Sequence, residues 1–254
     1  MITVIISARN PIPESTLERN IRKTVGSPLE LFMINNASGE NGLAAVYNFG
    51  ASQSQGDILV FMHDDAFFMN ENWGPVLESL FAQDPALGIV GVAGSQYIYN
   101  NQCSWTAAGR PFIKGRIIHD LQNGDFFATM FSPQKEDAQV VACSGVFFAV
   151  RRTLLTQFGF DEKTFDSFYF HELDFCMQAG KQWKIMVTGD IVVKHRSIGT
   201  YDKQWQHYGD LFLKKWAAQL PASCADTVPD PDPAKSVGAT RAHLKGKIEQ
   251  RTIA

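Results

Sequence analysis

The stretch that decides the fold is Ile58-Leu59-Val60-Phe61-Met62-His63-Asp64-Asp65, an apolar run that stops at an imidazole and two carboxylates. A short run of this kind is typical of a strand buried on both faces of a sheet. Similar apolar runs at residues 2–6, 29–34 and 87–93 predict three further strands. These four segments therefore predict the core of one sheet.

Helical signals lie between these runs. Ser15 and Glu18 form the S-x-x-E pattern of a helix N-terminus, and apolar residues follow them at helical spacing. Residues 43–54 and about 75–83 predict two more helices. The alternation predicts an α/β domain with a mostly parallel central sheet flanked by helices. In such sheets, ligands bind at the carboxyl ends of the strands.

The second half of the chain has a less regular pattern. Residues 96–139 are rich in glycine, asparagine and aromatic residues, which is typical of a functional loop region. Further elements are predicted at residues 140–150 (a strand broken at 143–145), 151–158 and 171–179 (helices), 185–188 and 191–195 (strands), and 205–219 (a helix). After these, residues 221–238 are typical of a linker, and residues 240–251 predict a loose basic helix.

Composition excludes several classes of protein. The chain has 254 residues, 45% of them hydrophobic and 19% charged, with a net charge of −3, which is ordinary for a soluble globular protein and excludes a nucleic-acid surface. Its four cysteines show no C-x-x-C spacing, which suits a reducing compartment and gives no sign of a zinc site. No apolar stretch reaches the roughly 18 residues of a transmembrane segment. We expect a cytoplasmic protein, with a peripheral position at the inner membrane face left open.

Three polar clusters follow predicted strands, at residues 7–10, 35–38 and 63–65. Because the carboxyl ends of parallel strands meet at one edge of a sheet, we expect these clusters to lie together. The carboxylates of Asp64 and Asp65 are the oxygen ligands that Mg²⁺ or Mn²⁺ needs beside a nucleotide diphosphate. The alternative is that both carboxylates cap the next helix or stay solvated.

Several short motifs follow one another along the chain. They are residues 4–10, 34–38 (Ile-Asn-Asn-Ala-Ser), 43–65, 144–148 (Ser-Gly-Val-Phe-Phe), 158–162 (Phe-Gly-Phe-Asp-Glu), 170–175 (Phe-His-Glu-Leu-Asp-Phe) and 192–195 (Val-Val-Lys-His). In order and spacing they resemble the family 2 glycosyltransferases of the GT-A fold, over roughly residues 2–200.

The resemblance has three departures from the family pattern. Asn35 and Asn36 stand where two aspartates are common, and His63 stands at the first aspartate of the D-x-D motif. In the family's E-D-x-D segment, His171 and Glu172 replace the leading pair. The asparagines can still form hydrogen bonds with a uracil or thymine base.

The resemblance implies a role for each matching residue. It implies a nucleotide-sugar donor of the UDP or dTDP type, with the donor-binding residues Ser7, Arg9, Asn36, Asn48 and Asp64. It implies a site for Mn²⁺ or Mg²⁺ at Asp65, His195 and His63, and a catalytic base, Glu172. It further implies acceptor contacts from Asp174 and Gly145, although Asp174 could instead pair with Arg151 or Arg152. Trp105, an aromatic residue of the segment 96–139, could stack on a sugar ring of the acceptor or close over the core.

The expected activity is therefore inverting transfer of a hexosyl or related sugar to the hydroxyl of a glycan, a lipid-linked or a small-molecule acceptor. We expect one domain over residues 1–220, with a nucleotide-binding half at about 1–95 and an acceptor half at about 96–220. A linker and C-terminal tail would fill residues 221–254.

Two other functions stay open. A non-catalytic sugar-binding member of the fold would account for the departures from the family motifs. A sugar nucleotidyltransferase is disfavoured because residues 1–18 contain one basic residue, Arg9, and no glycine, whereas that chemistry needs a glycine-rich basic loop. A Rossmann dehydrogenase is disfavoured because no G-x-G-x-x-G follows the first predicted strand.

Overall fold

The strand predicted from the apolar run is confirmed as β3 (Ile58–Met62), which lies inside a seven-stranded sheet with all its side chains buried. Leu59 and Phe61 point into one hydrophobic core, and Val60 and its neighbours on the other face point into a second. Successive side chains of a strand point to opposite faces, so a strand covered on both sides needs an unbroken apolar sequence.

The main sheet is mixed. The computed structural model describes residues 1–9, 15–120, 126–132, 134–197, 199, 201–232 and 240–244. In spatial order, its strands are β10 (Ala138–Val140), β13 (Lys184–Val187), β5 (Leu87–Gly91), β12 (Phe147–Arg151), β3, β1 (Ile2–Ala8) and β2 (Leu29–Asn35). The pairs β1/β2, β1/β3 and β5/β13 are parallel, but β12 is antiparallel to both β3 and β5, and β10 is antiparallel to β13. This corrects the prediction of a mostly parallel sheet, because an apolar run such as that of β12 does not reveal strand direction.

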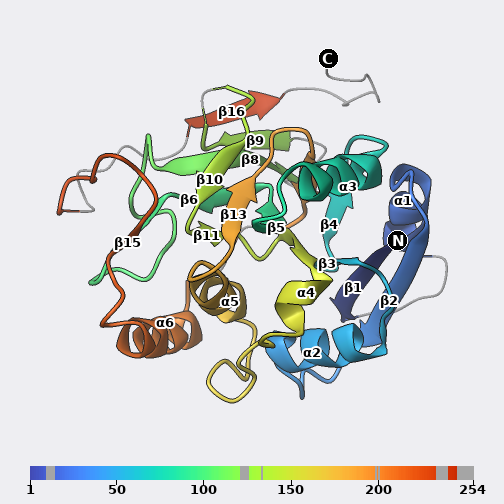
Figure 1. The fold of residues 1–254 in the computed structure, drawn as a ribbon, viewed down its shortest axis with the longest axis horizontal. Helices are drawn as coiled ribbons and strands as arrows, with labels where there is room; N and C mark the ends of the chain where they lie inside the picture. The colour runs from blue at the N-terminus through green and yellow to red at the C-terminus, as the bar shows by residue number, and fades with distance from the viewer. Residues whose placement is uncertain are drawn as a thin grey trace.

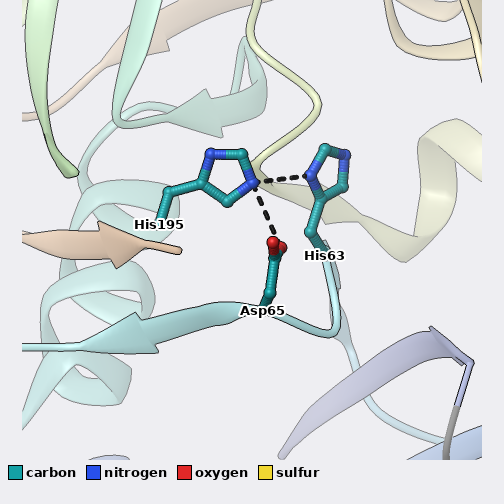
Figure 2. Close-up of side chains that lie close together, drawn as sticks. All are labelled: His63, Asp65 and His195. Atoms are coloured by element: carbon teal, nitrogen blue, oxygen red, sulfur yellow. Dashed lines mark hydrogen bonds and ion pairs between the residues drawn. The ribbon is translucent and has the colours of Figure 1, made fainter. Parts of the chain in front are cut away.

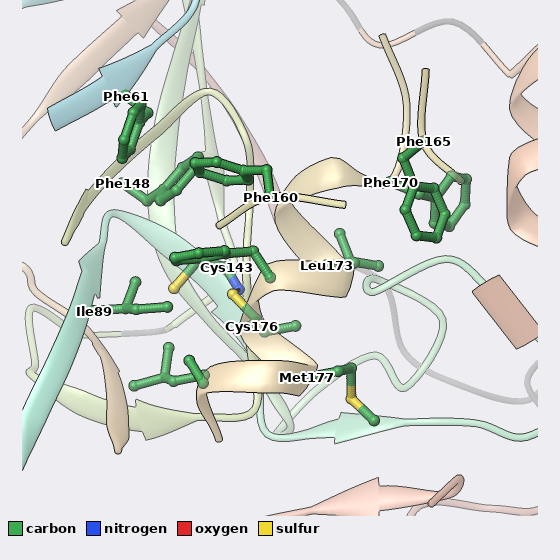
Figure 3. Packing of buried hydrophobic residues seen from close by; sticks show 14 of the residues in the cluster. Phe61, Ile89, Cys143, Phe148, Phe160, Phe165, Phe170, Leu173, Cys176 and Met177 are labelled. Carbon is green, nitrogen blue, oxygen red and sulfur yellow. Dashed lines mark hydrogen bonds between the residues drawn. The ribbon is translucent and has the colours of Figure 1, made fainter. Parts of the chain in front are cut away.

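Helices cover both faces of this sheet (Figure 1). On one face, α1 (Thr16–Thr24) and α3 (Trp73–Gln83) bury residues in the core that contains Val60. The other face is covered by α2 (Leu43–Gln53), α4 (Arg152–Leu155), α5 (His171–Ala179) and α6 (Lys203–Lys215). Figure 3 shows the core that contains Phe61, in which Leu173 and Cys176 of α5 belong to the same cluster as Phe148 of the sheet. The predicted N-terminus of the first helix is confirmed, since the Ser15 hydroxyl accepts a hydrogen bond from the backbone N–H of Glu18.

A second sheet corrects the prediction that residues 96–139 form an irregular loop region. Its strands are β11 (Ala142–Cys143), β6 (Ala93–Ser95), β8 (Ile113–Asp120), β14 (Val193–His195) and β4 (Ala66–Phe68), with β9 (Phe126–Met130) beside β8. Only one side of β8 is consistently buried, and polar residues alternate with apolar ones along it. Gly115 interrupts that alternation, so the period-two signal of the strand is weak in the sequence.

The C-terminal part also differs from the prediction. β15 (Ala222–Ser223) pairs with β7 (Tyr97–Ile98), so the start of the predicted linker packs against the domain. Residues 240–244 form a strand, β16 (Thr240–Leu244), paired antiparallel with β9, where a helix was predicted. The rest of that predicted helix lies outside the described residues. Among the helices that the structure describes, none combines the length and the apolar character needed to cross a membrane.

The parallel strands place the polar clusters together, as predicted. Ala8 at the end of β1 lies opposite Asn35 at the end of β2, and Ile6 lies opposite Met62 at the end of β3. The residues that follow β1, β2 and β3 therefore meet at one edge of the main sheet.

Candidate active site

Two histidines and an aspartate converge at this edge. Nδ1 of His63 lies 3.2 Å from Nε2 of His195, and that same Nε2 lies 3.1 Å from Oδ1 of Asp65 (Figure 2). One potential ligand atom from each residue can be chosen so that all three lie within 4.8 Å of one another. The three metal ligands predicted from distant parts of the sequence are thus brought together.

Backbone pairing fixes these three side chains. His63 and Asp65 belong to the short turn between β3 and β4, and the backbone N–H of His63 donates to the carbonyl of Val146. β14 pairs antiparallel with β4, which places His195 opposite Ala66. His195, the last residue of β14, therefore faces the turn that precedes β4.

The protonation states of the cluster suit a cation. Burial, together with the nearby His195 ring, lowers the pKa of His63 to about 4, so His63 is neutral at pH 7. Burial alone would raise the pKa of Asp65, but hydrogen bonding to His195 and Ser197 holds it well below its ordinary value. Neutral imidazoles and an ionised carboxylate are the forms that bind divalent metals.

Three polar atoms surround a single nitrogen of His195. Besides His63 and Asp65, the hydroxyl of Ser197 lies 3.1 Å from Nε2. That nitrogen has at most one proton, so it cannot donate a hydrogen bond to all of its neighbours. A cation bound by these side chains would take the place of the missing protons, and the donor set of two nitrogens and a carboxylate oxygen suits a first-row divalent metal.

Arg9 binds Asp64, the residue between His63 and Asp65 in the sequence. Its Nε lies 3.0 and 3.1 Å from the two carboxylate oxygens of Asp64, and its Nη2 lies 2.5 Å from one of them. The backbone N–H of Arg9 also donates to Asp64, while Nη2 lies 3.8 Å from Asp65. The Arg9 side chain is 72% exposed, so a ligand can reach this guanidinium next to the cluster.

A cavity of about 420 Å³, here called the Asn36 cavity, opens beside this pair. Four of the five predicted donor-binding residues line it, namely Ser7, Arg9, Asn36 and Asp64. The Asn36 amide donates to Ser7 Oγ and to the carbonyl of Asn41, and its Oδ1 accepts from the Asn41 N–H. Asn36 is therefore held rigidly at the cavity wall, and its Oδ1 keeps one lone pair for a ligand.

The fifth predicted donor residue, Asn48, lies elsewhere. Its side chain donates to the Phe160 carbonyl and to Glu162, and it accepts from the Phe160 N–H. These bonds connect α2 to the turn at residues 159–162, and Asn48 lines neither this cavity nor its neighbour.

A second cavity of about 590 Å³, here called the Trp105 cavity, adjoins the first. Its lining includes Trp105, Gly145 and Glu172, three residues predicted for acceptor binding and catalysis. His63 and Phe168 line both cavities, so the metal-ligand cluster lies where the cavities meet. Phe168 was one of several phenylalanines near the predicted site segments, and no site role was predicted for it.

Glu172 is a buried carboxyl at the start of α5. Burial raises its pKa to about 7, against the opposing effect of backbone N–H groups that include that of Gly145. Its Oε2 is buried and accepts no hydrogen bond. A Cβ at Gly145 would lie 3.1 Å from Glu172 Cδ, so the absence of a side chain there leaves room for the carboxyl. A carboxyl with a pKa near neutrality suits general-base chemistry.

His171 lies next to this carboxyl and also lines the Trp105 cavity. Its Nδ1 lies 3.3 Å from Glu172 Oε2 and 3.1 Å from the carbonyl oxygen of Phe168. Burial, together with the ring of His63, lowers the pKa of His171 to about 3. The ring is therefore uncharged, and it does not stabilise the ionised form of Glu172 as a cation would.

Asp174 is not brought to this pocket. Its side chain is fully buried, where Trp216 Nε1 and Gln178 Nε2 donate to it at 2.8 Å and Lys215 Nζ lies at 2.7 Å. These partners connect α5 to the end of α6. Arg151 and Arg152, the alternative partners, instead bind backbone carbonyls that include those of Leu87 and Gly56. The motif at residues 170–175 pointed to Asp174 as an acceptor contact, but it did not show that this face of α5 is turned away from the cavities.

Known proteins resemble this chain in family and in fold. The model of a "Glycosyltransferase like family" matches residues 9–217. The structure of GalNAc-T7 with UDP, GalNAc and Mn²⁺ is similar, with a TM-score of 0.51, 14% identity, and coverage of 77% of this chain and 44% of that one. So is the mannosyltransferase PcManGT from Pyrobaculum calidifontis with GDP-Man and Mn²⁺, with a TM-score of 0.51, 14% identity and coverage of 92% and 66%.

A search of curated proteins finds no match to the sequence. The chain spans less than half of the GalNAc-T7 chain and about two thirds of PcManGT. At these identities the likeness concerns the fold alone, and it confirms the predicted GT-A class with a mixed sheet.

Proposed function

The chain belongs to the glycosyltransferase-like family whose model matches residues 9–217, and from this premise we propose that it transfers a sugar from a nucleoside-diphosphate sugar to an acceptor hydroxyl. The observation that supports this most is the meeting of two cavities at His63. One cavity contains the polar strand ends, and the other contains a carboxyl with a pKa near 7.

The Asn36 cavity is the proposed donor site. The free lone pair of Asn36 can accept the N3–H of uracil or thymine, which suits a UDP or dTDP sugar. Arg9, exposed beside the cluster, offers the positive charge that a diphosphate attracts. The contacts of Asn36 and Arg9 thus match the two ends of a nucleotide diphosphate.

His63, Asp65 and His195 are the proposed ligands of Mn²⁺ or Mg²⁺. When bound there, the cation would neutralise the diphosphate and stabilise the charge that develops on the leaving group. Both similar structures contain Mn²⁺, which agrees with this assignment. A cation bound to Nε2 of His195 would displace the Ser197 hydroxyl from that nitrogen, and Ser197 would keep its hydrogen bond to Asp65, which lowers the pKa of that carboxyl.

Glu172 is the proposed base. It takes the proton of the acceptor hydroxyl as the oxygen forms a bond to the anomeric carbon of the donor. The bond between that carbon and the diphosphate oxygen breaks at the same time, and its electron pair leaves with the nucleoside diphosphate. Attack from the face opposite the leaving group inverts the anomeric configuration. The apolar surroundings that raise the pKa of Glu172 also make its ionised form a stronger base.

Donor screening tests this function. A panel of UDP, dTDP and GDP sugars would be tested with Mn²⁺, Mg²⁺ or EDTA for a shift in melting temperature and for release of the nucleotide. We expect at least one donor to raise the melting temperature only when a divalent cation is present.

Turnover should depend on the base as well. We expect Glu172→Gln to keep the thermal shift but to lose transfer. The matched control is Asp190→Asn, which removes a surface carboxylate that pairs with Lys135 and lines neither cavity. Thermal shifts without any transfer by the wild type would instead support a non-catalytic sugar-binding protein.

A further inference from the structure

The Trp105 cavity has two aromatic walls that come from different parts of the chain. Trp105 lies with its ring centroid 5.1 Å from that of Phe131. On the other wall, Trp205 lies 5.5 Å from Phe170 and 5.0 Å from Tyr201, measured between ring centroids. All five residues line the cavity. Flat apolar faces of this kind pack well against the C–H faces of a sugar ring.

Small uncharged polar groups line the same cavity. Hydroxyls line it at Ser104, Thr106, Thr129 and Ser144, and an imidazole lines it at His119. Hydroxyl groups both donate and accept hydrogen bonds, which suits a ligand with many hydroxyls of its own. Ser104 and Thr106 hydrogen bond to each other, and each hydroxyl can still bond to a ligand, whereas an aryl or purely apolar ligand would use none of this capacity.

Charge is scarce in the cavity. Among the described residues that line it, none is a lysine or an arginine, and Glu172 is the single carboxylic acid. A phosphate or carboxylate on an acceptor is normally bound by arginine or lysine. Arg9, by contrast, lines only the neighbouring Asn36 cavity. The basic residue Arg9 therefore lines one cavity, and the tryptophans line the other.

We propose that the acceptor is an uncharged saccharide whose ring stacks on Trp105 or Trp205 and whose hydroxyls bond to the serine, threonine and histidine groups of the same cavity. This inference rests on the proposed function, because it names the acceptor of the same site. The cavity volume of about 590 Å³ is within the range of pockets that enclose small-molecule ligands, which leaves room for more than one sugar ring. The stacked ring would present a hydroxyl to Glu172 at the cavity wall.

A binding experiment on the full chain tests the proposal without turnover. With UDP and Mn²⁺ present, saturation-transfer NMR and calorimetry would compare three groups of probes. The neutral group is maltose, cellobiose, lactose, mannobiose and chitobiose; the anionic group is glucose 6-phosphate and glucuronate; the aryl probe is 2-naphthol. We expect at least one neutral disaccharide to bind, and to bind more tightly than any anionic or aryl probe.

Variants then locate the binding. Trp105→Ala and Trp205→Ala should each weaken the Kd of that disaccharide about fivefold to tenfold, and the Phe variants should recover most of the loss. Trp183→Ala is the control, because Trp183 bonds to Gln157 and lines neither cavity. Thermal melts would confirm that each variant is folded.

The proposal is overturned if no neutral disaccharide binds, if an anionic or aryl probe binds more tightly, or if neither tryptophan variant weakens binding. Failure of the proposed function is a separate result, because UDP and Mn²⁺ binding is measured in the same titration before any acceptor probe is added.

Discussion

The pKa of Glu172 gives a prediction about stability that does not depend on turnover. Glu172→Gln replaces the carboxyl with an amide of the same shape, and the amide oxygen can still accept the backbone N–H of Gly145. Burial raises the pKa of the wild-type carboxyl from 4.5 to about 7. Below pH 4.5 the carboxyl is protonated in both the folded and the unfolded protein, so it favours neither state.

The magnitude follows from linkage. As the pH rises from 4.5 to about 7, Glu172 ionises in the unfolded chain but stays protonated in the folded protein. The folded protein therefore loses stability until its own Glu172 also ionises near pH 7. The difference between 4.5 and about 7 corresponds to ~3 kcal/mol at most. Because 15% of the Glu172 side chain is exposed, we expect a somewhat smaller value, about 2 kcal/mol. The glutamine variant does not have this loss.

Urea unfolding at pH 5 and pH 8 measures the effect. We expect Glu172→Gln to be close to the wild type in stability at pH 5 and more stable by about 2 kcal/mol at pH 8, or roughly 4–8 °C in melting temperature. The same variant should lose about 10²–10⁴-fold in transfer rate if Glu172 is the base. A variant that is equally or less stable than the wild type at pH 8 would refute the burial argument.

Four further predictions follow from the same geometry. Transfer by the wild type should rise about tenfold between pH 6 and pH 8 as Glu172 ionises, which a pH–rate profile with saturating donor would check, and a flat profile would contradict it. His195→Ala should raise the Mn²⁺ concentration that half-activates donor hydrolysis by about 10-fold or more, whereas a histidine outside the cluster would leave it unchanged. Asp174→Ala removes a buried partner of Lys215 that lies outside both cavities, so it should lower the free energy of unfolding by about 3 kcal/mol and leave the donor KM unchanged. An increase in donor KM with normal stability would instead indicate that Asp174 contacts a ligand. Gly145→Val should reduce transfer about 10-fold or more with donor binding retained, since the added side chain meets Glu172, and normal transfer would show that the carboxyl has room to move.

The sequence predicted the parts of the fold whose signal is local. The strand at β3 was bounded correctly because a chain segment buried on both faces must be apolar at every position. The second sheet was missed because β8 is buried mainly on one side and Gly115 interrupts its alternation. The direction of β12 could not be predicted, because its partners β3 and β5 determine it and lie far away in the sequence.

The site shows the same division. Asp65 and His195 were expected together from the resemblance to the family's metal-site motifs, and the structure places them 3.1 Å apart. Asn48 and Asp174 matched family motifs by type and spacing, but their side chains make buried or partly buried bonds within the protein. Phe168 could not be distinguished from the other phenylalanines near the site, because the two cavities that it lines form only in the folded chain.

The most direct test of the metal-assisted donor site is a calorimetric titration of UDP into the wild type and into Asp65→Asn, each with Mn²⁺ and with EDTA. We expect Mn²⁺ to tighten UDP binding about 10-fold or more in the wild type and to have little effect in Asp65→Asn. Equal UDP affinity with Mn²⁺ and with EDTA in the wild type would contradict the assignment of His63, Asp65 and His195 as the cation site.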